Sequence, residues 1–210
     1  MIGKGLYAVT PDEADSARLL DKVVQILDGG SRPTLLQYRN KAAPPALRRE
    51  QVQRLLELCR AAGVPLLIND TLELALELDA DGVHLGRGDG DPAAARKALD
   101  ARGPGRILGV SCYDEWPRAV AAAAEGADYV AFGAMFASPT KSAAPRADAA
   151  LLGRARRELG VTVVAIGGIT LANAGEIIAA GADLVAVISD IFDAPDPGAR
   201  AAAYRALWRG

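Results

Sequence analysis

Polar and charged residues gather at the ends of short apolar segments in this chain of 210 residues. In chain order they are Gln37-Tyr38-Arg39-Asn40-Lys41, Asn69-Asp70, Arg87-Gly88-Asp89 and Ser111, followed by Ser138-Pro139-Thr140-Lys141 in a later loop. If the segments are neighbouring parallel strands, Asp70 and Asp89 lie on adjacent loops and can share one hard cation such as Mg2+. Arg39, Lys41 and Lys141 supply the positive charge that the other oxygens of a diphosphate need. These residue types therefore favour the binding of a metal–diphosphate.

Simpler roles exist for each of these residues. An aspartate after a strand commonly caps a helix or stabilises a turn. A single arginine or lysine side chain mostly forms a surface ion pair. The residues alone leave both interpretations open.

A glycine pair offers a second place for an anion. Gly167-Gly168-Ile169-Thr170 follows apolar residues 163–166 and precedes a helical pattern. Glycines allow backbone N–H groups to approach a phosphate closely, and the loops after strands 7 and 8 of barrels commonly bind phosphate. Ser189, after the last apolar segment, is a second donor, although a Gly-Gly pair by itself is usually a turn.

Eight apolar segments must position these residues, and their Val, Ile and Leu content predicts strands that are buried on both faces. The predicted strands are residues 6–9, 34–39, 65–69, 82–86, 107–111, 129–133, 161–166 and 184–189. Amphipathic patterns between them predict helices, including residues 47–61, 117–125, 151–159 and 172–180. This alternation indicates an α/β protein with a parallel sheet. No linker rich in Pro or Ser interrupts the pattern, so we expect residues 1–210 to form one domain.

An internal repeat distinguishes between the two common architectures of such a sheet. The seven residues from Ala80 to Gly86 resemble those that begin at Ala127 and at Ala182, with an aspartate second in each copy. Each interval between copies contains one further strand, so the repeating unit is a pair of βα units. This periodicity favours a closed (β/α)8 TIM barrel over an open doubly wound sheet.

Composition excludes several classes of function. The net charge is −2, from 24 basic and 26 acidic residues, with no basic stripe, which argues against a nucleic-acid partner. We find no apolar run long enough to cross a membrane and no signal peptide. The single histidine, His84, excludes histidine pairs as metal ligands, and we expect it to have a structural or ligand-orienting role rather than to act as a base. We therefore expect a cytoplasmic protein that acts on small molecules.

Taken together and in chain order, the strand ends and loops described above resemble those of the thiamine-phosphate synthase family over nearly the whole chain. The matching motifs are Leu6-Tyr7-Ala8-Val9-Thr10, Gln37-Tyr38-Arg39-Asn40-Lys41, Asn69-Asp70, Ala80-Asp81-Gly82-Val83-His84-Leu85-Gly86, Gly109-Val110-Ser111, Ser138-Pro139-Thr140-Lys141, Ala165-Ile166-Gly167-Gly168-Ile169 and Val187-Ile188-Ser189. The resemblance implies that hydroxymethylpyrimidine diphosphate and hydroxyethylthiazole phosphate join to give thiamine phosphate and pyrophosphate. It also implies a dissociative mechanism assisted by Mg2+. The diphosphate leaves first, and the thiazole nitrogen traps the pyrimidine-stabilised cation.

The resemblance implies a role for each candidate residue. Asp70 and Asp89 would ligate Mg2+, and Gln37 and Asn69 would line the pyrimidine pocket. The groups expected at the reacting atoms and the diphosphate are Ser111, Arg39, Lys41 and Lys141, of which Ser111, Arg39 and Lys141 would take part in catalysis. The residues expected to bind the thiazole phosphate are Gly168, Ile188 and Ser189. Ser138 and Thr140 would contact either that phosphate or pyrophosphate.

Three positions depart from the family pattern. Arg87 stands where glutamine is frequent, Tyr38 where an aliphatic residue is frequent, and Ser138 where threonine is frequent. Two other functions stay open, namely a thiazole tautomerase of the same fold and a non-catalytic binder of a phosphorylated ligand. The joint presence of the aspartates and the cations argues for the synthase. The sequence does not decide whether the chain forms a homodimer.

Overall fold

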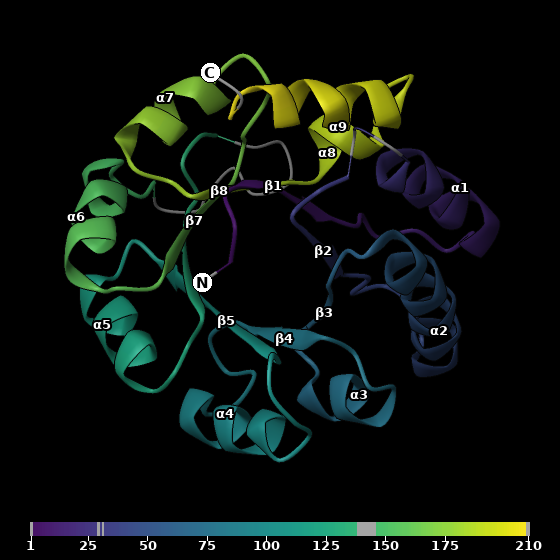
Figure 1. Cartoon of the computed structure of the whole chain (residues 1–210), viewed down its shortest axis with the longest axis horizontal. Helices are drawn as coiled ribbons and strands as arrows, with labels where there is room; N and C mark the ends of the chain where they lie inside the picture. The colour runs from purple at the N-terminus through teal and green to yellow at the C-terminus, as the bar shows by residue number, and fades with distance from the viewer. Residues whose placement is uncertain (1, 29, 31, 138–145, 209–210) are drawn as a thin grey trace.

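Eight parallel strands close into a barrel in sequence order, so that the last strand pairs with the first (Figure 1). The computed structural model describes residues 2–28, 30, 32–137 and 146–208. The strands are β1 (Gly5–Val9), β2 (Leu35–Tyr38), β3 (Leu66–Asn69), β4 (Gly82–Leu85), β5 (Ile107–Tyr113), β6 (Tyr129–Phe132), β7 (Thr162–Ile166) and β8 (Leu184–Val187). The prediction of a (β/α)8 TIM barrel is confirmed. Each predicted strand is present, and β5 extends two residues beyond its predicted end at residue 111.

Helices surround the barrel as an outer ring (Figure 1). They are α1 (Ser16–Leu27), α2 (Pro45–Ala62), α3 (Leu72–Glu77), α4 (Pro92–Asp100), α5 (Trp116–Ala124), α6 (Ala150–Glu158), α7 (Ala174–Ala180), α8 (Ser189–Phe192) and α9 (Pro197–Ala206). Local sequence sets several of their ends. Asp15, Asp91 and Asp196 each precede a helix and accept a hydrogen bond from a backbone N–H of its first turn. Gly63 ends α2 in the left-handed conformation, at φ 67°.

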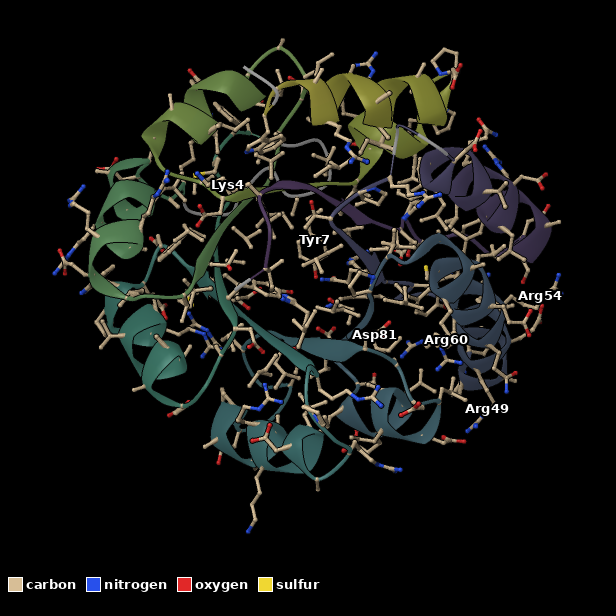
Figure 2. All side chains as sticks on the ribbon, viewed as in Figure 1. Lys4, Tyr7, Arg49, Arg54, Arg60 and Asp81 are labelled. Atoms are coloured by element: carbon tan, nitrogen blue, oxygen red, sulfur yellow. The ribbon has the colours of Figure 1, made fainter. Side chains whose placement is uncertain are left out.

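The strands separate an inner core from an outer core. Alternate side chains point into the barrel, where Tyr7, Leu35, Leu67 and Tyr129 form part of one buried cluster. The remaining strand side chains pack against the helices in a second, larger cluster. Figure 2 shows Tyr7 inside the ring of strands, whereas Arg49, on α2, lies outside it. The inner positions of the repeat hold His84, Ala131 and Ala186, as expected for a crowded interior.

The aspartates of the repeat have a structural role at the N-terminal edge of the barrel. Each precedes an even-numbered strand, and its Oδ2 accepts a hydrogen bond from a backbone N–H at the start of the preceding odd-numbered strand. The three bonds are Leu66 N to Asp81 at 2.8 Å, Leu108 N to Asp128 at 2.7 Å and Val163 N to Asp183 at 3.1 Å. The repeat thus fixes neighbouring strands at the edge opposite the predicted site.

Candidate active site

The C-terminal ends of β2 to β5 bring together most of the predicted site residues. Gln37, Asn69 and Ser111 are near the ends of β2, β3 and β5, and Asn69 is in register with His84 of β4. A pocket of about 220 Å3 opens beside them, between the ends of β2 and β3. It is lined by Tyr38, Asn40, Lys41, Arg48, Ile68, Asn69, Asp70, Thr71 and Leu74.

Asp70, Asp89 and Lys41 form a charged group at this edge. The ammonium Nζ of Lys41 lies 2.8 Å from Oδ2 of Asp70. Burial favours the neutral form of Asp70, but the contacts with Lys41 and Asp89 outweigh it, so the pKa of Asp70 lies below its usual value. Burial, together with the contact with Asp70, holds the pKa of Asp89 above its usual value. The two carboxylates therefore lie close enough for each to shift the pKa of the other.

Local backbone geometry explains the position of both carboxylates. Asp70 has φ 64°, a left-handed conformation that aspartate and asparagine tolerate better than most residues. The Asp89 side chain turns back onto β4, where its Oδ2 accepts a hydrogen bond from Gly86 N at 2.8 Å. A Cβ at Gly86 would lie 2.8 Å from that same oxygen. Glycine at position 86 therefore gives Asp89 the space to fold over the end of the strand.

Asp12, in the loop after β1, organises the loop that carries the predicted cations. Its Oδ1 accepts a hydrogen bond from Lys41 N at 2.6 Å, and its Oδ2 lies 3.2 Å from Arg39 Nη1. Burial opposes ionisation of Asp12, but these contacts outweigh it and lower the pKa of the carboxyl group. The two predicted cations at the end of β2 are thus held by different carboxylates, Arg39 by Asp12 and Lys41 by Asp70. Sequence reasoning missed Asp12, because a lone aspartate after a strand has no distinguishing pattern.

Two of the departures from the family pattern have a structural explanation. The Tyr38 side chain points out of the barrel, and its hydroxyl donates a hydrogen bond to Gln51 of α2 at 2.8 Å. The Arg87 guanidinium forms an ion pair with Glu115 and lies over the Tyr113 ring, 5.1 Å from its centroid. Arg87 is therefore engaged with residues at the end of β5 and the start of α5.

Ser111 is held by two neighbours that sequence reasoning did not link to it. Arg118 of α5 donates from Nε to the Ser111 carbonyl oxygen at 2.6 Å and from Nη2 to the Gly86 carbonyl oxygen at 3.1 Å. The Ser111 hydroxyl lies 2.8 Å from Nε2 of His84. Burial lowers the pKa of His84 to about 4, so the ring is neutral at physiological pH. His84, for which a structural or ligand-orienting role is predicted, thus contacts the predicted site residue Ser111 directly.

The predicted second anion site lies across the mouth, after β7 and β8. Gly168 has φ 65°, and the Asn173 side chain donates a hydrogen bond to its carbonyl oxygen at 3.0 Å. Ile188 packs against the inner core, and exposed Ser189 begins α8. The predicted residues Ser138, Thr140 and Lys141 lie outside the described residues.

In the described part of the chain, no group of three or more Asp, Glu, His or Cys side chains lies close enough together to hold a metal ion by itself. Asp70 and Asp89 would together offer two carboxylate ligands, a number that would suit an ion that keeps waters and binds phosphate oxygens. Among the same residues, no helix has the length and apolar character needed to cross a membrane.

Known proteins resemble this chain along almost its whole length. The family model described as thiamine monophosphate synthase matches residues 6–191. Thiamine-phosphate synthase from Aromatoleum aromaticum is 63% identical over 205 residues, which cover 98% of this chain and 96% of that protein. Thiamine-phosphate synthase from Azoarcus sp. strain BH72 is 60% identical, over 98% of this chain and 97% of that protein. The solved structure of thiamine phosphate pyrophosphorylase from Pyrococcus furiosus superimposes with a TM-score of 0.81 at 30% identity, covering 97% of this chain and 94% of that one. By sequence and by fold, this chain belongs to the thiamine-phosphate synthase family.

Proposed function

We propose that this chain joins hydroxymethylpyrimidine diphosphate to hydroxyethylthiazole phosphate, giving thiamine phosphate and releasing pyrophosphate. The observation that carries the proposal is the charged group of Lys41, Asp70 and Asp89 at the ends of three successive strands. A chain that only bound a phosphorylated thiazole would have no use for this group. Family membership supports the same activity.

The carboxylates fit a divalent cation of the Mg2+ type. Their oxygens are hard ligands, and the low pKa of Asp70 keeps at least one of them ionised at neutral pH. When bound, Mg2+ would neutralise part of the charge that develops on the departing diphosphate. Asp70 and Asp89 would hold the ion, and Lys41, which pairs with Asp70, would contact phosphate oxygens of the same substrate.

The other residues position the substrates and stabilise charge, which is what a dissociative substitution needs. Arg39 would add positive charge beside the diphosphate, and Gln37 and Asn69 would fix the pyrimidine ring. The cation left on the pyrimidine methylene carbon would then be trapped by the thiazole nitrogen. The C–O bond to diphosphate breaks with its electron pair going to the leaving group, and a C–N bond forms with the pair from the thiazole nitrogen.

The second phosphate would bind at the ends of β7 and β8. Gly168 follows β7, and Ile188 and Ser189 follow β8. The left-handed conformation of Gly168 turns the backbone sharply after β7. On the family resemblance alone, we propose that Lys141 holds the diphosphate and that Ser138 and Thr140 contact the thiazole phosphate or pyrophosphate.

An assay with both substrates tests the proposal. Thiamine phosphate and pyrophosphate should form in equal amounts, only with both substrates and Mg2+ present, and EDTA should stop the reaction. Conversion of a thiazole substrate alone would favour the tautomerase. Tight binding of the thiazole phosphate without any product would favour a binding protein.

The location and assembly of the chain remain predictions. We propose that the protein is cytoplasmic and that a homodimer is its simplest assembly. Light scattering on the purified chain measures its mass in solution directly, and a mass near 21.8 kDa would contradict the dimer.

A further inference from the structure

Five polar side chains form one continuous line of hydrogen bonds through the interior of the barrel. Gln37 Nε2 lies 2.6 Å from the Tyr7 hydroxyl, which lies 2.7 Å from the Tyr129 hydroxyl. The Tyr129 hydroxyl lies 2.8 Å from Nδ1 of His84, whose Nε2 lies 2.8 Å from Oγ of Ser111. Gln37, Tyr7, Tyr129 and His84 are buried, and Ser111 is half-buried at the mouth. One end of the line therefore faces the place where substrate binds.

The amide of Gln37 sets the direction of this line. An amide nitrogen can only donate, so the Tyr7 oxygen accepts from Gln37. The Tyr129 oxygen is then the acceptor within reach of the Tyr7 hydroxyl, which donates to it. The Tyr129 hydroxyl in turn donates a hydrogen bond to Nδ1 of His84. His84 must then carry its own proton on Nε2 and donate it to the Ser111 oxygen.

A count of protons supports the same arrangement. The line consists of four hydrogen bonds. With a neutral His84 it has one donated proton for each of them. These protons belong to the Gln37 amide, the two tyrosine hydroxyls and Nε2 of His84. A second proton on the imidazole would leave one buried donor without an acceptor, which proteins avoid. With Nε2 of Gln37 as the first donor, only one tautomer of His84 satisfies every link.

We propose that Gln37, Tyr7, Tyr129 and His84 form a directed line of donors that fixes the Ser111 hydroxyl as a donor toward the substrate. Ser111 Oγ accepts a hydrogen bond from Nε2 of His84. The Ser111 hydroxyl is therefore free to donate a hydrogen bond to an acceptor atom of the pyrimidine diphosphate. Tyr7, Tyr129 and His84 are positioning residues in this scheme, since they act only through Ser111. The identity of the acceptor rests on the proposed function, whereas the direction of the line does not.

The direction also decides what Ser111 cannot do. In a serine nucleophile paired with histidine, the hydroxyl donates its proton to the ring nitrogen, which acts as a base. Here Nε2 of His84 already carries a proton, so it cannot activate Ser111 in this way. The line therefore makes Ser111 a provider of a hydrogen bond, in agreement with a substitution that needs charge stabilisation rather than a protein nucleophile.

Nitrogen NMR tests the direction without any substrate. His84 is the single histidine of the chain, so protein labelled with 15N-histidine and made without a histidine tag gives one pair of imidazole signals. Near neutral pH we expect a proton on Nε2 and a bare Nδ1. A proton on Nδ1 alone, or an imidazolium ring, would overturn the proposal.

Kinetics tests whether the line acts through Ser111. Tyr129→Phe should lower kcat about tenfold, the effect of one misdirected hydrogen bond, with little change in KM for the thiazole phosphate. Added to Ser111→Ala, it should cause no further loss, because both changes remove the same donor. Tyr204→Phe is the matched control, since Tyr204 is equally buried and its hydroxyl bonds to Asp190, outside the line.

Two kinetic results would contradict the proposal. One is unchanged kcat in Tyr129→Phe, and the other is a loss in the double variant that equals the product of the two single losses. A wild-type chain that formed no thiamine phosphate would instead contradict the proposed function, and the NMR result would stand independently of it.

Discussion

The Lys41 ammonium and the Asp70 carboxylate, on the loops after β2 and β3, are joined by a 2.8 Å ion pair at the mouth of the barrel. The pair keeps Asp70 ionised, so the carboxylate is ready to bind a cation. It also places a positive charge beside the phosphate oxygens that such a cation would attract. Binding of a metal–diphosphate would therefore extend an arrangement of charges that the protein already holds.

Removing either carboxylate should impair turnover and leave the fold intact. We expect Asp70→Asn and Asp89→Asn each to lower kcat about 100-fold or more, because a preorganised charge-stabilising ion loses a ligand. Asparagine suits position 70 because it tolerates the left-handed conformation there. Activity should be measured over a Mg2+ titration, with Asp21→Asn on the exposed face of α1 as the control. Full activity of both variants at every Mg2+ concentration would disprove the metal assignment.

Lys41→Ala should weaken binding of the pyrimidine diphosphate specifically. Loss of one cation that contacts phosphate predicts an increase in Kd of roughly 10- to 100-fold for this ligand. Binding of the thiazole phosphate should change little. Calorimetry with each ligand measures both, and Lys97→Ala, on α4, controls for the loss of one exposed lysine. Equal loss of both ligands in Lys41→Ala would mean that the two sites are not separate.

Gly168→Ala should weaken binding of the thiazole phosphate and lower stability. A Cβ at position 168 would lie 2.6 Å from the carbonyl oxygen of Ala137 and 2.8 Å from Cβ of Phe136, so the loop must shift. Gly63→Ala is a close control, because Gly63 has nearly the same φ and no atom within 4 Å of the added Cβ. The difference between the two melting curves therefore measures the clash alone. If both variants bound the thiazole phosphate like the wild type, the phosphate assignment at Gly168 would fail.

His84 should make the fold less stable in acid. Its pKa is about 4 in the folded chain and about 6.5 in the unfolded chain, so between these values the unfolded state binds more protons. The free energy of unfolding should therefore fall as pH drops from 6.5 to 4, by up to about 3 kcal/mol from this group. Urea unfolding at a series of pH values measures the slope. The slope should be shallower in His84→Gln, and an identical slope in the two proteins would contradict the pKa assignment.

The aspartates at the N-terminal edge should contribute to stability and not to catalysis. Asp183→Ala leaves the Val163 N–H without its acceptor, which should cost about 1–3 kcal/mol. The KM values for both substrates should stay unchanged, because the edge is at the opposite end of the barrel from the site. Thermal unfolding and steady-state kinetics on the same preparation test both statements. A large change in KM with unchanged stability would show that the repeat serves the site.

Much of this fold could be predicted from local sequence patterns. Short segments rich in apolar residues mark every strand, and the repeat around Asp81 indicates closure of the barrel. Short helices such as α3 and α8 gave too few turns for a periodic signal. The positions of Asp70 and Asp89 followed from the rule that barrel chemistry lies at the strand ends.

The contacts that organise the site could not be predicted in this way. Tyr7 and Tyr129 are aromatic residues in apolar strands, and such residues usually belong to the core. Their hydroxyls meet across the barrel although 122 residues separate them in the chain, and no local pattern encodes such a pair. Arg118 likewise resembles an ordinary surface arginine of α5, yet its guanidinium binds the ends of β4 and β5.

The pairing of β1 with β8 has a consequence for synthesis of the chain on the ribosome. β1 hydrogen-bonds to a strand that begins at Leu184, so the barrel cannot close until β8 has emerged. Until then, β1 and the newest strand each present an unpaired edge, which is a template for aggregation. Contacts between consecutive strands and helices can form earlier, because their partners are close in sequence. The residues of β8 therefore determine when the nascent chain becomes protected from aggregation. The predicted catalytic groups at β2 to β5 emerge from the ribosome much sooner.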